Sequence, residues 1–265
     1  MRNVRLLLGM EIVALMCSAV EAHELKVFAD PAAAQVGGRA SVSLSWGHKT
    51  WGADLLVDAK TLDRWELFTP SFSAIPLKKE GLSLQTNTIE LKQEGVYQLV
   101  ASRTPAVFTI VIDNEGNRLH KAGPKPGIKE GTIDFAQRSQ QFAKGLIVAG
   151  AAKADVLKPV GLPIEIVPVQ AAVDWRSGRL LQFRVLFGGK PLAGEQVLAS
   201  YVGFQPENAW CYATETDRQG VAAVRVGQAG TWVLVVELRK LTTGSTRDQY
   251  DFEKYTGTLT LPVQP

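Results

Sequence analysis

The sequence predicts a mainly β protein with two tandem β-sandwich (Ig-like) domains and one α-helix near the domain junction. Short segments of alternating polar and apolar residues recur along the chain, and they are separated by many of its 24 glycines and 13 prolines. One segment alone shows helical spacing. The 265 residues are 46% hydrophobic and 21% charged, which supports packed cores and excludes wholesale disorder.

Residues Met1–Ala22 have the pattern of a secretory signal peptide. A positive n-region and an apolar stretch over 6–20 precede the small-residue cleavage site Val20-Glu21-Ala22. Cleavage after Ala22 makes His23 the first residue of the mature protein, whereas cleavage after Ala19 leaves three residues in front of it. No later segment approaches 18 consecutive apolar residues. We therefore expect a periplasmic protein with no stable membrane insertion after signal cleavage.

The expected N-terminal domain covers residues 23–160. Its predicted strands are Leu25–Ala29, Val42–Trp46, Ala53–Val57, Trp65–Phe68, Thr88–Leu91, Val96–Ser102 and Val107–Ile112. The last two are separated only by Thr104-Pro105, which predicts a hairpin. The stretch His120–Gly131 is rich in glycine, proline and lysine, which is typical of a loop. Over Thr132–Val148, Phe135, Phe142 and Leu146 recur at helical spacing, so we expect an α-helix there.

The expected C-terminal domain covers residues 161–265. Seven short segments separated by turn signals predict strands there: Ile164–Val167, Leu180–Phe187, Gln196–Val202, Cys211–Thr216, Val221–Val226, Thr231–Leu238 and Thr256–Leu261. Seven strands at this spacing are typical of an Ig-like sandwich. We expect this domain to act in partner contact or as a spacer.

Composition and missing motifs exclude several function classes. The 29 basic residues against 26 acidic ones give a net charge of +3 without a dense basic run, so we expect no nucleic-acid partner. The sequence has no nucleophile elbow, zincin motif, P-loop or dinucleotide fingerprint. We therefore expect no enzymatic activity and name no catalytic residue. Cys211 is the only cysteine after the signal, so the mature protein has no intramolecular disulfide.

The three histidines all lie in the expected N-terminal domain, which suggests one metal site. As a mature N-terminus, His23 offers a free α-amine and its ring Nδ1, and these two nitrogens close one chelate ring on Cu(II) or Ni(II). His48 follows Gly47 at the end of a predicted strand, and His120 lies in the Gly/Pro/Lys-rich stretch. The alternative for each histidine is a solvated terminal or loop residue.

Other residues near His48 have possible supporting roles. Asp54 and Asp58 are candidate acceptors that orient an imidazole from outside the metal's own ligands, with surface solvation as the alternative. We expect the nearby Trp46, Trp51 and Trp65 to pack in the core or at its rim.

Several segments, in this order, carry a resemblance to a known family. They are His23-Glu24-Leu25, Gly47-His48, Gly95-Val96-Tyr97-Gln98-Leu99, 138–146, Pro163-Ile164-Glu165-Ile166-Val167-Pro168, 189–194 and 216–222. Together they resemble the periplasmic nickel-uptake proteins, the additional periplasmic component of nickel ECF-type transporters. The resemblance covers nearly the whole mature chain.

The resemblance implies a periplasmic accessory protein that binds Ni²⁺, with Co²⁺ or Cu²⁺ as alternatives, and assists uptake by membrane nickel transporter subunits. It also implies His23 and His48 as metal ligands, with His120 as a further candidate. Two alternatives remain open. One is a periplasmic copper-binding protein that uses the same N-terminal chelate, and the other is a structural or adhesive β-sandwich protein without metal.

Overall fold

The structure is a computed structural model, and it describes residues 23–48, 50, 52, 54–151, 157–204 and 210–265. The expected signal peptide, Met1–Ala22, and Trp51 lie outside the described residues. The described chain is mainly β, with four short 3-10 turns and no α-helix: η1 (Ala59–Thr61), η2 (Lys125–Gly127), η3 (Ala172–Asp174) and η4 (Gly244–Asp248). The mainly β prediction is therefore confirmed.

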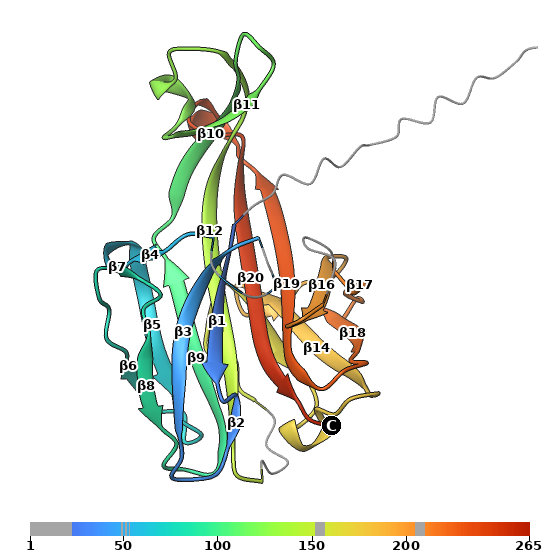
Figure 1. Ribbon diagram of the computed structural model, residues 1–265. Coiled ribbons are helices and arrows are strands. Elements are labelled where there is room, and N and C mark those ends of the chain that lie inside the picture. Colours follow the sequence, from blue (N-terminus) through green and yellow to red (C-terminus); the bar gives the residue numbers. More distant parts are fainter. Residues whose placement is uncertain (1–22, 49, 51, 53, 152–156, 205–209) are drawn as a thin grey trace, which may run out of the picture.

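One large sheet runs through the whole molecule (Figure 1). Its main path is, in order, β17 (Tyr212–Glu215), β16 (Gln196–Tyr201), β19 (Gly230–Leu241), β20 (Phe252–Val263), β12 (Thr132–Ala149), β9 (Gly95–Arg103), β5 (Leu62–Phe68) and β6 (Ala74–Pro76). Three further strands join β12 or each other: β2 (Ala33–Ala34), β10 (Ala106–Ile112) and β11 (Arg118–Ala122). Because this sheet takes strands from both expected domains, the division into two tandem domains is not confirmed.

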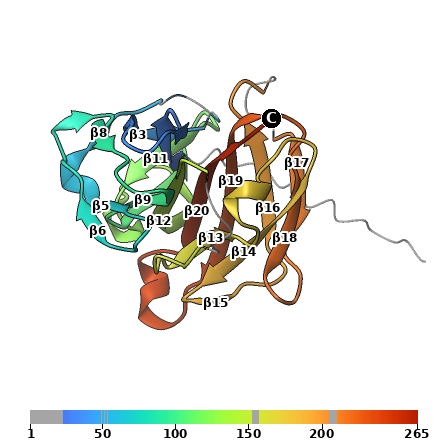
Figure 2. The same cartoon turned by 90° about the horizontal axis from the view of Figure 1, so that it is seen from below.

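Smaller sheets cover the two faces of the large one. The first contains β1 (Glu24–Asp30), β3 (Arg39–Gly47) and β8 (Asn87–Glu90). The second contains β13 (Ile164–Pro168), β14 (Leu180–Phe187), β15 (Lys190–Pro191) and β18 (Val221–Arg225). A two-stranded sheet pairs β4 (Val57–Asp58) with β7 (Leu82–Ser83). Figure 2 shows the first two on either side of the long strands.

The alternation of β12 explains this layering. Phe142, Leu146 and Val148 pack in the core under the β13–β14 sheet. The intervening Ala143 and Ile147 pack in the second core, under β1 and β3. Successive side chains of a strand point to opposite faces, so β12 is buried on both sides.

The predicted helix over Thr132–Val148 is therefore wrong. Residues 140–149 of β12 are all buried, although they include the polar Gln140, Gln141 and Lys144. A strand buried on both faces lacks a simple alternation of apolar and polar residues. The large apolar residues of this segment happen to recur at helical spacing. The segment is nevertheless a strand, because it pairs with β9, β10 and β20 in the large sheet.

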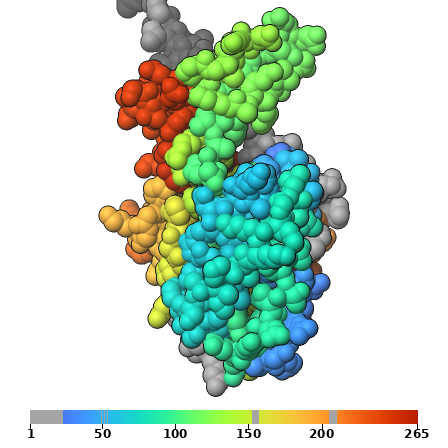
Figure 3. All heavy atoms as spheres, turned by 90° about the vertical axis from the view of Figure 1, so that its left-hand side faces the viewer, coloured from blue at the N-terminus to red at the C-terminus, as the bar shows by residue number. Residues whose placement is uncertain are grey.

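The predicted hairpin across Thr104-Pro105 is also wrong. β9 and β10 do not pair with each other, because both run antiparallel to β12, one after the other: Gly95 lies opposite Ala149 and Ala106 opposite Ser139. Pro105 has no N–H to donate to a ladder, so it interrupts the pairing without reversing the chain. β10, β11 and the first part of β12 form an arm above the body, which Figure 3 shows in green.

The first described strand is attached to the last one. The Thr258 hydroxyl of β20 donates to the Leu25 carbonyl oxygen over 2.7 Å, and the Thr260 hydroxyl donates to the Val27 carbonyl oxygen. All four residues are buried. This contact fixes β1, and with it the first described residues of the chain, against the large sheet.

Candidate metal centre

The pairing of β1 with β3 sets the positions of His23 and His48. The two strands are antiparallel and their last pair is Glu24 with Gly47. One residue beyond that pair, His23 precedes β1 and His48 follows β3, so the two histidines are neighbours at the open end of the sheet. Their ring centroids lie 4.1 Å apart. The structure therefore brings together two of the three predicted ligands.

Asp54 reaches the same place because the chain folds back on itself after β3. The backbone N–H groups of Asp54 and Leu55 both donate to the Trp46 carbonyl oxygen over 3.1 Å. A side chain at Gly47 would not fit under this turn, since a Cβ there would lie 2.7 Å from Asp54 Oδ2 and 2.8 Å from the Asp54 backbone nitrogen. Glycine is required at 47 for space.

Asp54 fixes the orientation and the tautomer of His48. Its Oδ2 accepts from the His48 backbone N–H over 2.8 Å and from the ring Nδ1 over 2.9 Å. The hydrogen bond from the His48 backbone lowers the pKa of Asp54, so the carboxylate is ionised and acts only as an acceptor. In a neutral His48 ring this hydrogen bond places the proton on Nδ1 and leaves the lone pair on Nε2.

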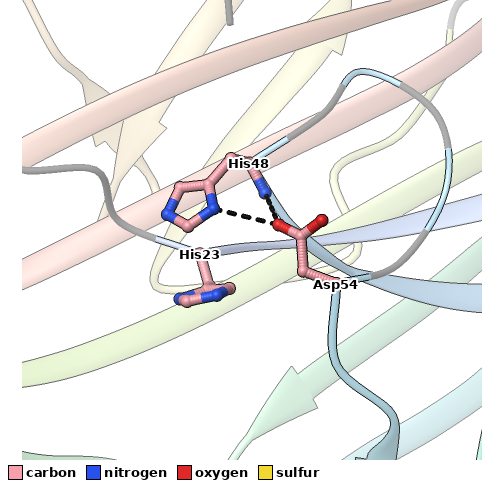
Figure 4. A group of neighbouring side chains, drawn as sticks. All are labelled: His23, His48 and Asp54. Carbon is pink, nitrogen blue, oxygen red and sulfur yellow. Dashed lines mark hydrogen bonds and ion pairs between the residues drawn. The ribbon is translucent and has the colours of Figure 1, made fainter.

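The free nitrogen of His48 has no other role in the described structure. Nε2 is buried and has no hydrogen-bond partner among the described residues. Potential ligand atoms of His23, His48 and Asp54 all lie within 4.8 Å of one another (Figure 4). A carboxylate behind a histidine whose other nitrogen faces a metal is a recurring arrangement in metal sites. These residues fit a divalent transition-metal ion.

His23 is held by its backbone and favoured in its neutral form. The Gln141 side-chain amide donates to the His23 carbonyl oxygen over 2.8 Å. Burial lowers the pKa of His23, and the neighbouring His48 lowers it further. A neutral imidazole is the form that binds a metal.

His120 lies apart from this cluster but lines the cavity beside it. Contrary to the predicted loop, it belongs to β11, where it pairs with Ile110 and stacks on Phe108 at 5.6 Å between ring centroids. It is not one of the residues whose ligand atoms converge. A cavity of about 310 Å³ has both His23 and His120 in its wall.

The remaining residues that the sequence singled out near His48 lie in the core, beside His23 or at a 3-10 turn. Trp65 is buried in the core, and Trp46 packs beside His23 with 5.6 Å between ring centroids. Asp58 accepts from the Lys60 backbone N–H and so caps η1. Sequence reasoning missed Arg103, whose guanidinium stacks on Trp46 in the wall of the cavity. No motif marks Arg103, which reaches the cavity as the last residue of β9.

The chain belongs to the family defined as "Domain of unknown function (DUF4198)", whose model matches residues 20–240. No curated protein matches the chain. Among solved structures, the D0-D1 domain of Intimin matches 90% of this chain and 97% of its own at 10% identity. A fibronectin(III)-like module of Clostridium thermocellum CbhA matches 89% of this chain and 94% of its own at 8% identity. Both have a TM-score of 0.20. None of the helical turns in the described residues is long and apolar enough to cross a membrane.

Proposed function

We propose that this member of the DUF4198 family is a periplasmic accessory protein that binds a divalent metal, nickel, and assists its uptake by a membrane transporter. The observation that supports this most is the convergence of His23, His48 and Asp54 at one end of β1 and β3. The signal pattern of residues 1–22 and the resemblance to nickel-uptake proteins support the location and the transporter partner.

The proposed ligands supply mostly nitrogen. After cleavage behind Ala22, His23 gives its α-amine and ring Nδ1, and His48 gives Nε2. Asp54 orients His48 and lies close enough to the cluster to offer an oxygen as well. Nickel(II) and copper(II) favour such nitrogen-rich sites. The side chains of His48 and Asp54 are 23% and 31% exposed, so an ion can be exchanged with a partner.

The test uses the protein purified after signal cleavage, with its N-terminus established by mass spectrometry. Native mass spectrometry and calorimetry then measure Ni²⁺ binding to this form and to a form with one alanine added before His23. We expect one bound nickel, and weaker binding both in the extended form and in His48→Ala. His120→Ala is the matched control, because His120 lies outside the cluster.

The outcomes separate the proposed function from its alternatives. Equal nickel affinity in the native and extended forms would overturn the amine chelate. A strong preference for Cu²⁺ under competition would favour the copper-binding alternative, because copper exceeds nickel in the general affinity order and selectivity must come from the site. If no divalent ion raises the melting temperature, the protein is a structural β-sandwich, since ligand binding to the folded state must stabilise it.

A further inference from the structure

The cavity beside the histidine pair has features of a second binding site. Its wall is built from the end of β3, the junction between β9 and β10, the base of the arm and β12. Its volume of about 310 Å³ is at the lower end of the range for small-molecule sites. His23 belongs to this wall and to the metal cluster, so one bound molecule can contact both.

Arg103 is a half-buried cation without a counter-charge among the residues that the structure describes. Its Cζ lies 3.6 Å from the centroid of the Trp46 ring, and Nε is buried without a hydrogen-bond partner among the described residues. None of the described acidic residues forms an ion pair with it, and burial lowers its pKa. A buried charge without a partner is costly. A guanidinium stacked on a ring still directs its N–H groups outward in its own plane, where they match a carboxylate.

Other cavity residues also have buried polar atoms for which the described part of the chain offers no hydrogen-bond partner. They are Nε1 of Trp46 and the side-chain oxygens of Gln137 and Gln141. Gln137 is 1% exposed and Gln141 is 9% exposed. The orientation of the Gln141 amide is fixed, because its nitrogen donates to the His23 carbonyl oxygen. Its Oε1 therefore needs a donor. Buried polar groups in proteins are rarely left unpaired.

The polar groups of the wall determine which chemical groups a bound molecule must carry. Arg103, Trp46 and the nearby Lys121 require acceptors, and no acidic side chain is present among the described residues of the wall. The glutamine oxygens require a hydroxyl or an amine. A molecule that carries a carboxylate and a neighbouring hydroxyl or amine is also a chelator of divalent metals, whereas inorganic phosphate is small for the cavity and mostly an acceptor.

We propose that this cavity binds a small hydroxy- or amino-carboxylate, held through its carboxylate by Arg103, and that the metal reaches His23 and His48 as a complex with this molecule. The second part rests on the proposed function. The first part concerns the cavity alone and holds without it.

The experiment is native mass spectrometry of the mature protein with citrate, L-malate and L-histidine, each with and without Ni²⁺. Trimethyl citrate, which has no free carboxylate, is the uncharged probe. The variants are Arg103→Gln and Arg103→Lys, and Arg218→Gln is the matched control, in an exposed turn that is not part of the wall. Thermal unfolding checks that each variant is folded. Because Arg103→Gln removes an unpaired buried charge, we expect its melting temperature to be unchanged or higher.

We expect a mass for protein, nickel and one carboxylate in the wild type and Arg218→Gln. In Arg103→Gln we expect protein with nickel alone, and in Arg103→Lys a carboxylate affinity at least about tenfold lower, since lysine lacks the planar fork. A wild type that binds nickel but none of the three carboxylates overturns the inference and leaves the proposed function. A wild type that binds a carboxylate in an Arg103-dependent way but no metal supports the cavity site and overturns the proposed function.

Discussion

His23 and His48 are neighbours because each lies one residue beyond the last pair of the β1–β3 ladder, Glu24 and Gly47. The 4.1 Å between their ring centroids is therefore set by strand register. A strand whose one face is buried cannot slip by one residue without exchanging its faces. Leu25 and Val27 lie in the core under this sheet, and their burial fixes the register that brings the two histidines together.

Removal of the Asp54 carboxylate should weaken metal binding. In Asp54→Ala, His48 loses the acceptor that fixes its tautomer and orientation, and we expect about a 10- to 100-fold loss of Ni²⁺ affinity. Asp54→Asn keeps an acceptor but loses the charge, so its loss should be smaller. Competition with a chromophoric chelator measures both. Asp58→Ala is the control, since Asp58 caps η1, and an equal loss in that variant would contradict the role of Asp54.

Gly47→Ala should move Asp54 away from the histidines. The new Cβ would lie 2.8 Å from the Asp54 backbone nitrogen, so the turn itself must shift. We expect a loss of about 1–3 kcal/mol in the free energy of unfolding, as for other overpacked sites, together with weaker Ni²⁺ binding. Urea unfolding and the same competition titration measure these. Gly227→Ala has open space around its Cβ and an ordinary φ, so it should change neither quantity.

The stability of the metal-free protein should fall as the pH drops below about 6.5, the ordinary pKa of histidine. Burial lowers the pKa of His23 in the folded state, so between the two pKa values the unfolded chain binds a proton that the folded one does not. Urea unfolding between pH 7.5 and about 5 measures this loss. His23→Phe should reduce its slope, and an identical slope in that variant would assign the effect to other groups.

Ni²⁺ affinity should fall over a higher pH range than the His23 ring alone predicts. The free α-amine has an ordinary pKa of about 7.7–8.0, and it must lose its proton before it binds a metal. Calorimetry in buffers of different ionisation enthalpy should therefore show proton release at pH 7. An affinity that is constant from pH 8 to pH 6.5 would show that the amine is not a ligand.

The buried ion pair between Lys144 and Glu165 should be important for stability. Lys144 Nζ lies 2.7 Å from Glu165 Oε1, and this carboxylate also accepts from the backbone N–H groups of residues 160–162. Lys144→Met leaves a buried carboxylate without its cation, and we expect a loss of about 3–5 kcal/mol in unfolding free energy. Arg39→Met breaks the exposed pair with Glu90 and should have little effect. Similar losses in both would contradict the role of burial.

The sequence alone predicted most strands, because alternating polar and apolar residues mark them. β1 and β14 follow their predicted segments closely, and β3 contains its predicted segment. It predicted an incorrect helix at β12, where both faces are buried and alternation disappears. A local sequence pattern also does not predict which strands pair. β9 and β10, for example, each pair with β12 and not with each other.

The site was predictable where the residues were chemically unusual. The small number of histidines made His23 and His48 visible, and Asp54 was a candidate through its closeness to His48 in sequence. Arg103, Gln137 and Gln141 were not found, because ordinary polar residues acquire significance only when the fold, here through β9 and β12, places them around one cavity. The separation of His120 from the cluster likewise depends on the direction of the arm.

The hydrogen bonds from Thr258 and Thr260 to β1 have a consequence for the stage of folding at which His23 and His48 are brought together. The chain emerges from synthesis or export with its amino-terminal end first, yet β1 finds part of its support on a strand that begins at residue 252. Domains generally fold as units once their sequence is available. A nascent chain that has already exposed His23 and His48 therefore still lacks the strand that holds β1 in place until residues 252–263 have emerged.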